Sequence, residues 1–234
     1  MKLSAPISVL KQRAKAVSRN EGVPLHQALD RIAKQEGFVA WSLLAAKTAV
    51  NEPVSTLLAQ LRAGDLVLLG ARPGQGKTLL SIELAIQTMR RGSQAAFFTL
   101  DFTSTDVANC FKALGEDLGA FSDRFRVDES DEICAEYILA KLASAPANTL
   151  VVIDYLQLLD QKREHSDLMR QVQLLKNFAS ERRLTVLCLS QIDRRYNATD
   201  RSCPGAGDVR LPNPLDLSLF DKMCFLHQST ILIA

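Results

Sequence analysis

The stretch from Leu66 to Leu80, LVLLGARPGQGKTLL, decides the fold of this chain. It opens with an apolar run of the kind that forms a strand buried on both faces. A turn rich in Gly and Pro follows, and then a helical pattern of apolar residues from Leu79 to Met89. A strand, a Gly-rich turn and a helix in that order are what a phosphate-binding loop requires, so we predict that this stretch binds a nucleotide.

The loop supplies groups suited to a polyphosphate and a divalent cation. Its backbone N–H groups lie at a helix start, which carries roughly half a positive charge. Lys77 is expected to neutralise the β- and γ-phosphates, and Thr78 to offer its hydroxyl to Mg²⁺. One position departs from the pattern G-x-x-x-x-G-K-T, since Ala71 stands where the first Gly is expected. The predicted nucleotide-binding residues are Arg72, Pro73, Gly74, Gln75, Gly76, Lys77, Thr78 and Leu79.

Composition limits the class of protein. A length of 234 residues permits one sizeable domain with an appendage. The hydrophobic share of 47% and the charged share of 23% are ordinary for a soluble globular protein. The net charge is only +2, so any nucleic-acid contact must come from a local patch. The five cysteines form no C-x-x-C pair, and no apolar run is long enough to cross a membrane, so we expect a reduced, cytoplasmic setting and no membrane partner.

The N-terminal segment, residues 1–50, is expected to form a small helical appendage, because its apolar residues recur at helical spacing, with a third short helix around Trp41. Residues 49–55 are interpreted as a linker, since Pro53 discourages helix at Glu52. We therefore expect the second domain to span 51–234. The basic residues of this segment are interpreted as a solvated helix face, and nucleic-acid contact is the alternative. These residues are Lys2, Lys11, Arg13, Lys15 and Arg19.

Downstream of the loop, strands alternate with helical patterns, which predicts an α/β fold with a mostly parallel sheet between two layers of helices. The run LVVID ends in Asp154, a carboxylate at the edge where open α/β sheets bind ligands. There Asp154 can hold Mg²⁺ beside the Thr78 hydroxyl, directly or through water. The alternative is an Asp that merely caps a turn. The strands are expected at 66–70, 94–100, 124–127, 150–154, 184–189 and 222–226.

Four segments fall into one pattern. In this order and spacing, ARPGQGKT, FFTLD, VVIDYLQLL and LSQIDR resemble the RecA-like motor domain of DnaB-type replicative helicases, over roughly residues 54–228. The resemblance implies that Lys77 and Thr78 are the Walker A pair, that Asp154 is the Walker B aspartate, and that Gln191 senses the γ-phosphate. It also implies that the strand ending at Gln191 lies between the phosphate-loop strand and the Walker B strand.

Three departures from the family pattern are visible. Asp101 stands where the family has a Glu that positions or activates water, and the Asp side chain is shorter. The chain ends at Ala234, before the hairpin from which the family lends a Lys and an Arg to a neighbouring subunit, so slow hydrolysis is expected. Residues 1–50 do not resemble the family's N-terminal collar. Family analogy favours a homo-oligomeric ring.

The function expected from the sequence is Mg²⁺-dependent ATP binding and hydrolysis, coupled to single-stranded DNA. The expected catalytic residues are Lys77, Asp101, Asp154 and Gln191, with Thr78 and Asp154 as the Mg²⁺ ligands. Two basic loops are candidate DNA contacts, with Tyr196 placed to stack on bases, although a solvated loop would look similar. Their candidate residues are Lys162, Arg163, Arg194, Arg195 and Arg210. Two other functions stay open: a nucleotide-binding regulatory module with little or no turnover and, less favoured, a P-loop kinase of a small molecule.

Overall fold

The computed structural model describes residues 4–5, 7–41, 44, 54–160, 166–198, 203–211, 213–227 and 230–233. The chain divides into two compact units, Met1–Glu52 and Pro53–Ala234. The third N-terminal helix, expected around Trp41, falls mostly outside the described residues. Within the described ranges, no helix combines the length and the apolar character needed to span a membrane.

The smaller unit is a pair of helices, α1 (Ile7–Glu21) and α2 (Leu25–Gln35), which pack against each other. Pro24 precedes α2 as its N-cap, where its fixed backbone leads into the helix. The apolar residues that recur at helical spacing meet between the two helices. Leu10, Ala14, Ala28, Ile32 and Ala33 form a small core there, and Leu44, beyond both helices, is part of it.

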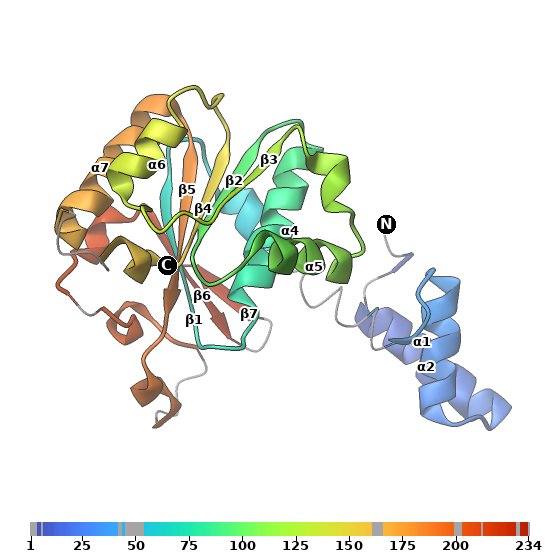
Figure 1. The fold of residues 1–234 in the computed structure, drawn as a ribbon. Coiled ribbons are helices and arrows are strands. Elements are labelled where there is room, and N and C mark those ends of the chain that lie inside the picture. The colour runs from blue at the N-terminus through green and yellow to red at the C-terminus, as the bar shows by residue number, and fades with distance from the viewer. Residues whose placement is uncertain are drawn as a thin grey trace. The chain divides into compact units, whose positions relative to one another are not determined.

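The larger unit is built on a seven-stranded sheet in the order β3-β2-β4-β5-β1-β6-β7 (Figure 1). Adjacent strands are parallel except for the antiparallel pair β6 and β7. β5 lies between β1 and β4, as the resemblance predicts. The strands are β1 (Leu66–Ala71), β2 (Ala95–Thr99), β3 (Phe125–Asp128), β4 (Leu150–Asp154), β5 (Thr185–Gln191), β6 (Lys222–His227) and β7 (Thr230–Ile233).

Helices cover both faces of this sheet. Figure 1 shows α4 and α5 on one face and α6 and α7 on the other. α4 packs against β1, β2 and β4, while α7 packs against β1 and β5. The central strands are therefore buried on both sides, which explains why they are continuous apolar runs. The helices are α4 (Lys77–Arg90), α5 (Ser104–Ala113), α6 (Ala135–Lys141) and α7 (Leu168–Arg182), with 3₁₀ turns η1 (Leu118–Phe121), η2 (Leu156–Asp160), η3 (Arg194–Ala198), η4 (Ala206–Asp208) and η5 (Leu217–Leu219).

Two elements differ from the sequence-based expectation. Residues 54–60 form a helix where the end of the linker was expected, and its Val54 and Leu57 are buried. The apolar residues of β7 form a strand because they pair with β6, with Leu226 opposite Ile231. The α/β class and the parallel core of the sheet are confirmed.

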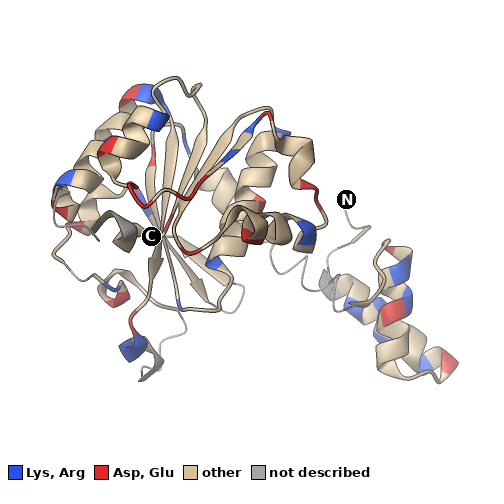
Figure 2. Cartoon of the chain, in the orientation of Figure 1, with Lys and Arg blue, Asp and Glu red and all other residues tan. Residues whose placement is uncertain are grey.

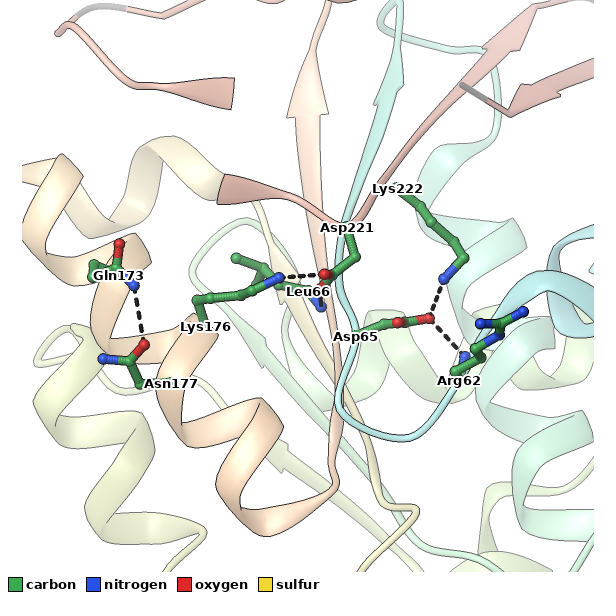
Figure 3. A network of polar contacts seen from close by, with 8 residues as sticks. All are labelled: Arg62, Asp65, Leu66, Gln173, Lys176, Asn177, Asp221 and Lys222. Carbon is green, nitrogen blue, oxygen red and sulfur yellow. Dashed lines mark hydrogen bonds and ion pairs between the residues drawn. The ribbon is translucent and has the colours of Figure 1, made fainter. Parts of the chain in front are cut away.

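The amino ends of β1 and β6 are joined by a network of charged groups (Figure 3). Lys222 Nζ donates to Asp65 Oδ2 at 2.5 Å, and the same oxygen accepts a backbone N–H from the preceding turn at 2.7 Å. Asp221 Oδ2 accepts the N–H of Leu66 at 2.8 Å, and its other oxygen pairs with Lys176 of α7. These contacts hold β1 to β6 and to the helix layer at the edge opposite the phosphate loop.

Candidate nucleotide-binding site

The loop between β1 and α4 is shaped by two glycines. Gly74 has φ +77° and Gly76 has φ +83°, a backbone region that L side chains rarely adopt. Gly76 is the N-cap of α4, and the helix bond from Leu80 N–H to its carbonyl measures 2.9 Å. The N–H groups ahead of Leu80 lie before the helical ladder and point toward the loop. The start of α4 is therefore suited to hold an anion.

Three predicted side chains meet where this helix start faces the carboxyl end of β4. Thr78 Oγ1 donates to Asp154 Oδ2 at 2.8 Å. Lys77 Nζ lies 3.6 Å from Asp154 Oδ1. The Asp154 side chain is fully buried, and that of Lys77 is 15% exposed. Because a buried carboxylate is costly without a nearby cation, Lys77 compensates part of the Asp154 charge.

The compensation of Asp154 is incomplete. Its Oδ1 atom has no hydrogen-bond partner among the described residues. Burial raises the pKa of Asp154 above its ordinary value of 3.8, Lys77 and the Thr78 hydroxyl oppose this, and Asp101 adds to the increase. The ionised carboxylate therefore retains an unmet demand for positive charge.

The donor set fits a hard divalent cation. A buried carboxylate oxygen without a hydrogen bond and a hydroxyl are ligands that Mg²⁺ accepts. Across the part of the chain that the structure describes, no three His, Cys, Asp or Glu side chains gather to hold a metal. Mg²⁺ in nucleotide sites is commonly bound by one or two protein groups together with phosphates and water. Thr78 and Asp154 match that arrangement.

Asp101 lies just beyond the end of β2. The β2–β4 register pairs Thr99 with Asp154, so Asp101 is two residues past this pair. Thr99 Oγ1 accepts the N–H groups of Asp101 and Phe102, both at 3.2 Å, and so fixes the turn. The Asp101 side chain is exposed. Burial raises the pKa of Tyr155, and the negative charge of Asp101 raises it further. The same charge also acts to raise the pKa of Asp154. Asp101 is thus a solvent-accessible carboxylate close to the loop.

Gln191 ends β5 beside the phosphate loop. The β1–β5 register pairs it with Ala71, the first residue of the loop pattern. Its carbonyl accepts the N–H of Arg210 at 2.8 Å. Arg72 Nη1 donates to the carbonyl of Ile192 at 3.0 Å, so this guanidinium holds the chain that follows Gln191. The backbone of Arg72 remains in the loop, while its side chain joins the loop to β5.

Gln157 has no role in the sequence-based prediction, yet it lies at the centre of this edge. Its Nε2 atom donates to Ser190 Oγ at 3.1 Å and to the carbonyl of Arg210. It thereby ties the segment after β4 to the end of β5. The signal in the sequence is a polar residue among the apolar positions of VVIDYLQLL, three residues after Asp154.

The candidate nucleic-acid contacts are partly described. Arg194, Arg195 and Arg210 are exposed. Arg195 Nε lies 3.9 Å from Asp193 Oδ1, a surface pair that contributes little to stability. These side chains follow the strand that ends at Gln191 and leave positive charge open to solvent. Two other predicted contacts, Lys162 and Arg163, lie outside the described residues.

The prediction that Tyr196 stacks on bases is wrong. Its side chain is only 4% exposed. Its ring meets His227 of β6 edge-on, with 5.7 Å between ring centroids. A loop aromatic buries its large apolar area wherever a neighbouring strand offers a surface, and here β6 provides one. His227, which shows no partner in the sequence, is the residue against which Tyr196 packs.

The fold and the loop define a class of protein. A parallel sheet carries a Gly-rich loop between β1 and α4, an Asp at the end of the strand two positions away, and β5 between them. This is the arrangement of a RecA-like P-loop ATPase. The family described as "ATPase: KaiC" matches residues 47–203, which is more than half of the chain. The chain belongs to this ATPase family.

Related sequences narrow the class. A probable plasmid replicative DNA helicase of Chlamydia trachomatis is 29% identical over 183 residues, covering 64% of this chain and 40% of that protein. The replicative DNA helicase DnaB of Mycoplasma pneumoniae is 23% identical over 214 residues, covering 75% of this chain and 45% of that protein. The predicted resemblance to DnaB-type helicases is confirmed. The chain spans less than half the length of these relatives.

Solved structures agree on the fold. A structure described as an ATPase domain superposes with a TM-score of 0.61 at 20% identity, covering 76% of this chain and 75% of that one. A DnaB-like replicative helicase, described with its interactions with primase, gives a TM-score of 0.60 at 19% identity over 93% of this chain and 64% of its own. At these identities the likeness establishes the RecA-like fold.

Proposed function

We propose that this chain binds ATP with Mg²⁺, hydrolyses it, and couples hydrolysis to single-stranded DNA. The observation that carries the proposal is the meeting of Thr78 with Asp154 at 2.8 Å and of Lys77 with Asp154 at 3.6 Å. These groups lie at the N-terminus of α4, where a Gly-rich loop leaves backbone N–H groups directed at an anion.

Each residue has a role that its position supports. The loop N–H groups and Lys77 bind and neutralise the phosphates. Thr78 and Asp154 hold Mg²⁺, which supplies positive charge beside the β- and γ-phosphates when it is bound. Asp101, exposed at the same edge, orients the attacking water. Gln191, paired in register with Ala71 of the loop, responds to the γ-phosphate.

Coupling to DNA is supported by what lies next to Gln191. The exposed Arg210 bonds to its carbonyl through the backbone, and Arg194 follows it on η3. Relatives over this region bear the name of replicative DNA helicases. We therefore propose single-stranded DNA as the partner and a ring of several copies as the working form, the latter by analogy with DnaB-type helicases.

The test is an ATP hydrolysis assay with and without single-stranded DNA, accompanied by calorimetric measurement of ATP binding with Mg²⁺. DNA-stimulated turnover is the expected result. Tight ATP binding without turnover would point to a regulatory nucleotide-binding module instead. Turnover that requires a small phosphate acceptor would point to a kinase, and absence of ATP binding would overturn the proposal entirely.

A further inference from the structure

The two units of the chain differ in charge. Residues 1–52 contain eight Lys and Arg against four Asp and Glu, whereas residues 53–234 contain 20 against 22. The smaller unit is therefore basic although the chain as a whole is nearly neutral. Figure 2 shows Lys and Arg on both helices of this unit. Such an asymmetry between two parts of a chain suggests a polyanionic partner for the basic part.

The charge on α1 is arranged in a line. Lys11, Lys15 and Arg19 follow one another at i, i+4 and i+8, and all three are exposed. Residues with this spacing share one face of a helix, about 6 Å apart along its axis. We call these three residues the basic stripe. Their side chains present three positive charges in a row.

The three acidic residues of this unit that the structure describes have partners outside the basic stripe. Glu21 pairs with Arg31 at 2.6 Å. Glu36 accepts the backbone N–H of Ser4 at 2.8 Å, and Asp30 accepts the N–H of Trp41 at 2.8 Å. Among the residues that the structure describes, no carboxylate forms an ion pair with the basic stripe. The charge of the stripe is thus left for an external partner.

The packing of α1 limits what that partner can be. Leu10 and Ala14 are buried in the core between α1 and α2. A helix that binds a lipid surface must insert its apolar face, and here α2 covers that face. A row of exposed cations beside a covered apolar face complements a row of phosphates.

We propose that the basic stripe binds the phosphate backbone of nucleic acid and gives this chain a DNA contact separate from its ATPase domain. The proposal takes up the nucleic-acid contact that the sequence left as the alternative to a solvated helix face. The choice of single-stranded DNA rests on the proposed function, whereas the stripe itself rests on its geometry and charge. Because the contacts are to phosphates, they carry no base specificity.

The test compares the whole chain with the triple variant Lys11→Gln, Lys15→Gln, Arg19→Gln. Gln keeps the helix propensity of the replaced residues, so the fold is retained. Affinity for a labelled oligothymidine is measured without nucleotide over a range of salt concentrations. Log K falls as log salt rises, and each lost phosphate contact makes this slope less steep by about 0.7. The slope of the triple variant should therefore be shallower by about 2, and its affinity should be about tenfold or more weaker.

A matched control removes three exposed basic residues from the ATPase domain: Arg91→Gln, Lys112→Gln and Arg126→Gln. This control changes the net charge by the same amount. Because its residues lie outside the basic stripe, it should leave the slope nearly unaltered. An equal effect of both variants, or no effect of either, overturns the proposal. Binding of polyglutamate is measured as well. If the stripe variant loses polyglutamate binding while its oligothymidine binding is unchanged, the partner is an acidic protein and the proposal is overturned. A chain that binds oligothymidine through the stripe with this salt dependence, yet hydrolyses no ATP, would retain this inference and refute the proposed function.

Discussion

Carboxylates at the amino ends and at the carboxyl ends of the strands are compensated to different degrees. At the amino edge, Asp65 and Asp221 each meet a Lys and a backbone N–H (Figure 3). At the carboxyl ends, Asp154 is fully buried, and its Oδ1 atom, 3.6 Å from Lys77 Nζ, has no hydrogen-bond partner in the described chain. Burial raises the pKa of Asp154. Partial burial also acts to raise the pKa of Asp221, but Lys176 and the Leu66 N–H lower it below its ordinary value.

The difference separates stability from function within one sheet. A fully paired carboxylate ties β1 to β6 and contributes to the free energy of unfolding. A carboxylate with an unmet demand for positive charge costs stability in the empty protein and is retained where a ligand completes it. The following substitutions test this contrast, from the largest expected effect to the smallest.

The largest effect is expected from Lys77→Met at the carboxyl edge. Removing this cation takes away charge that the phosphates need, so hydrolysis should fall by about 10³-fold. ATP affinity, measured by calorimetry, should fall as well. Lys141→Met on α6 serves as the control and should leave both quantities unchanged. Unaltered ATP affinity in the Lys77 variant would contradict the assignment of the phosphate loop.

Asp101 should respond to both the charge and the length of its side chain. Asp101→Asn is expected to lower turnover by about 10²-fold, because a misplaced water loses orientation, with little change in ATP affinity. Asp101→Glu should raise turnover, since one more methylene brings the carboxylate nearer to the phosphate loop. Steady-state hydrolysis rates of the two variants check this. If neither rate moves, Asp101 does not position the water.

Paired substitutions at the two edges should change stability in opposite directions. In the absence of nucleotide and Mg²⁺, Asp221→Asn should lower the free energy of unfolding by about 0.5–1 kcal/mol, since it weakens a charged hydrogen-bonded pair that solvent partly screens. Asp154→Asn should raise it by about 1 kcal/mol, because it removes a buried charge whose ionised form is disfavoured. Urea unfolding at pH 7 measures both. ATP hydrolysis should persist in the Asp221 variant and be lost in the Asp154 variant. If both substitutions lower the free energy of unfolding, the proposed difference between the two carboxylates is wrong.

The smallest effect is a pH dependence of opposite sign at the two edges. The folded pKa of Asp221 lies below its ordinary 3.8, so its stabilising contribution is present above that pH and is lost as pH falls through the folded pKa. The folded pKa of Asp154 lies above 3.8, so its destabilising effect is absent in acid and develops as pH rises through that pKa. Unfolding measured between about pH 3 and pH 7 should therefore show the Asp221→Asn difference shrinking toward acid. The gain from Asp154→Asn should also vanish there, and a pH-independent difference at either site would contradict its pKa direction.

Much of the fold could be predicted because its signals are local. The apolar runs at β1, β4 and β5 are short, continuous and bounded, so the pattern of a buried strand is visible within a few residues. The Gly-rich loop is recognisable for the same reason. Lys77, Thr78 and Asp154 were predicted as a group, and the structure brings them together. Their roles in binding ATP and Mg²⁺ stay predictions until they are measured.

The features that escaped prediction depend on distant partners. β7 is a strand because β6 lies beside it, and Tyr196 is buried because His227 faces it. Gln157 acquires a position only through Ser190, 33 residues away, and Arg210, 53 residues away. No local pattern encodes such contacts.

The sequence by itself determined the phosphate loop, the central strands and the identity of the residues around them, because glycine conformations and apolar runs act over a few residues. Only the tertiary structure decided which charges are satisfied. Asp65 is bonded to Lys222, which lies 157 residues away in the sequence, and Asp154 is bonded to Thr78, which lies 76 residues away. Whether a carboxylate gains a full set of hydrogen bonds or keeps an oxygen without one depends on how the strands and helices are placed around it. Burial makes that difference large because water is absent to compensate.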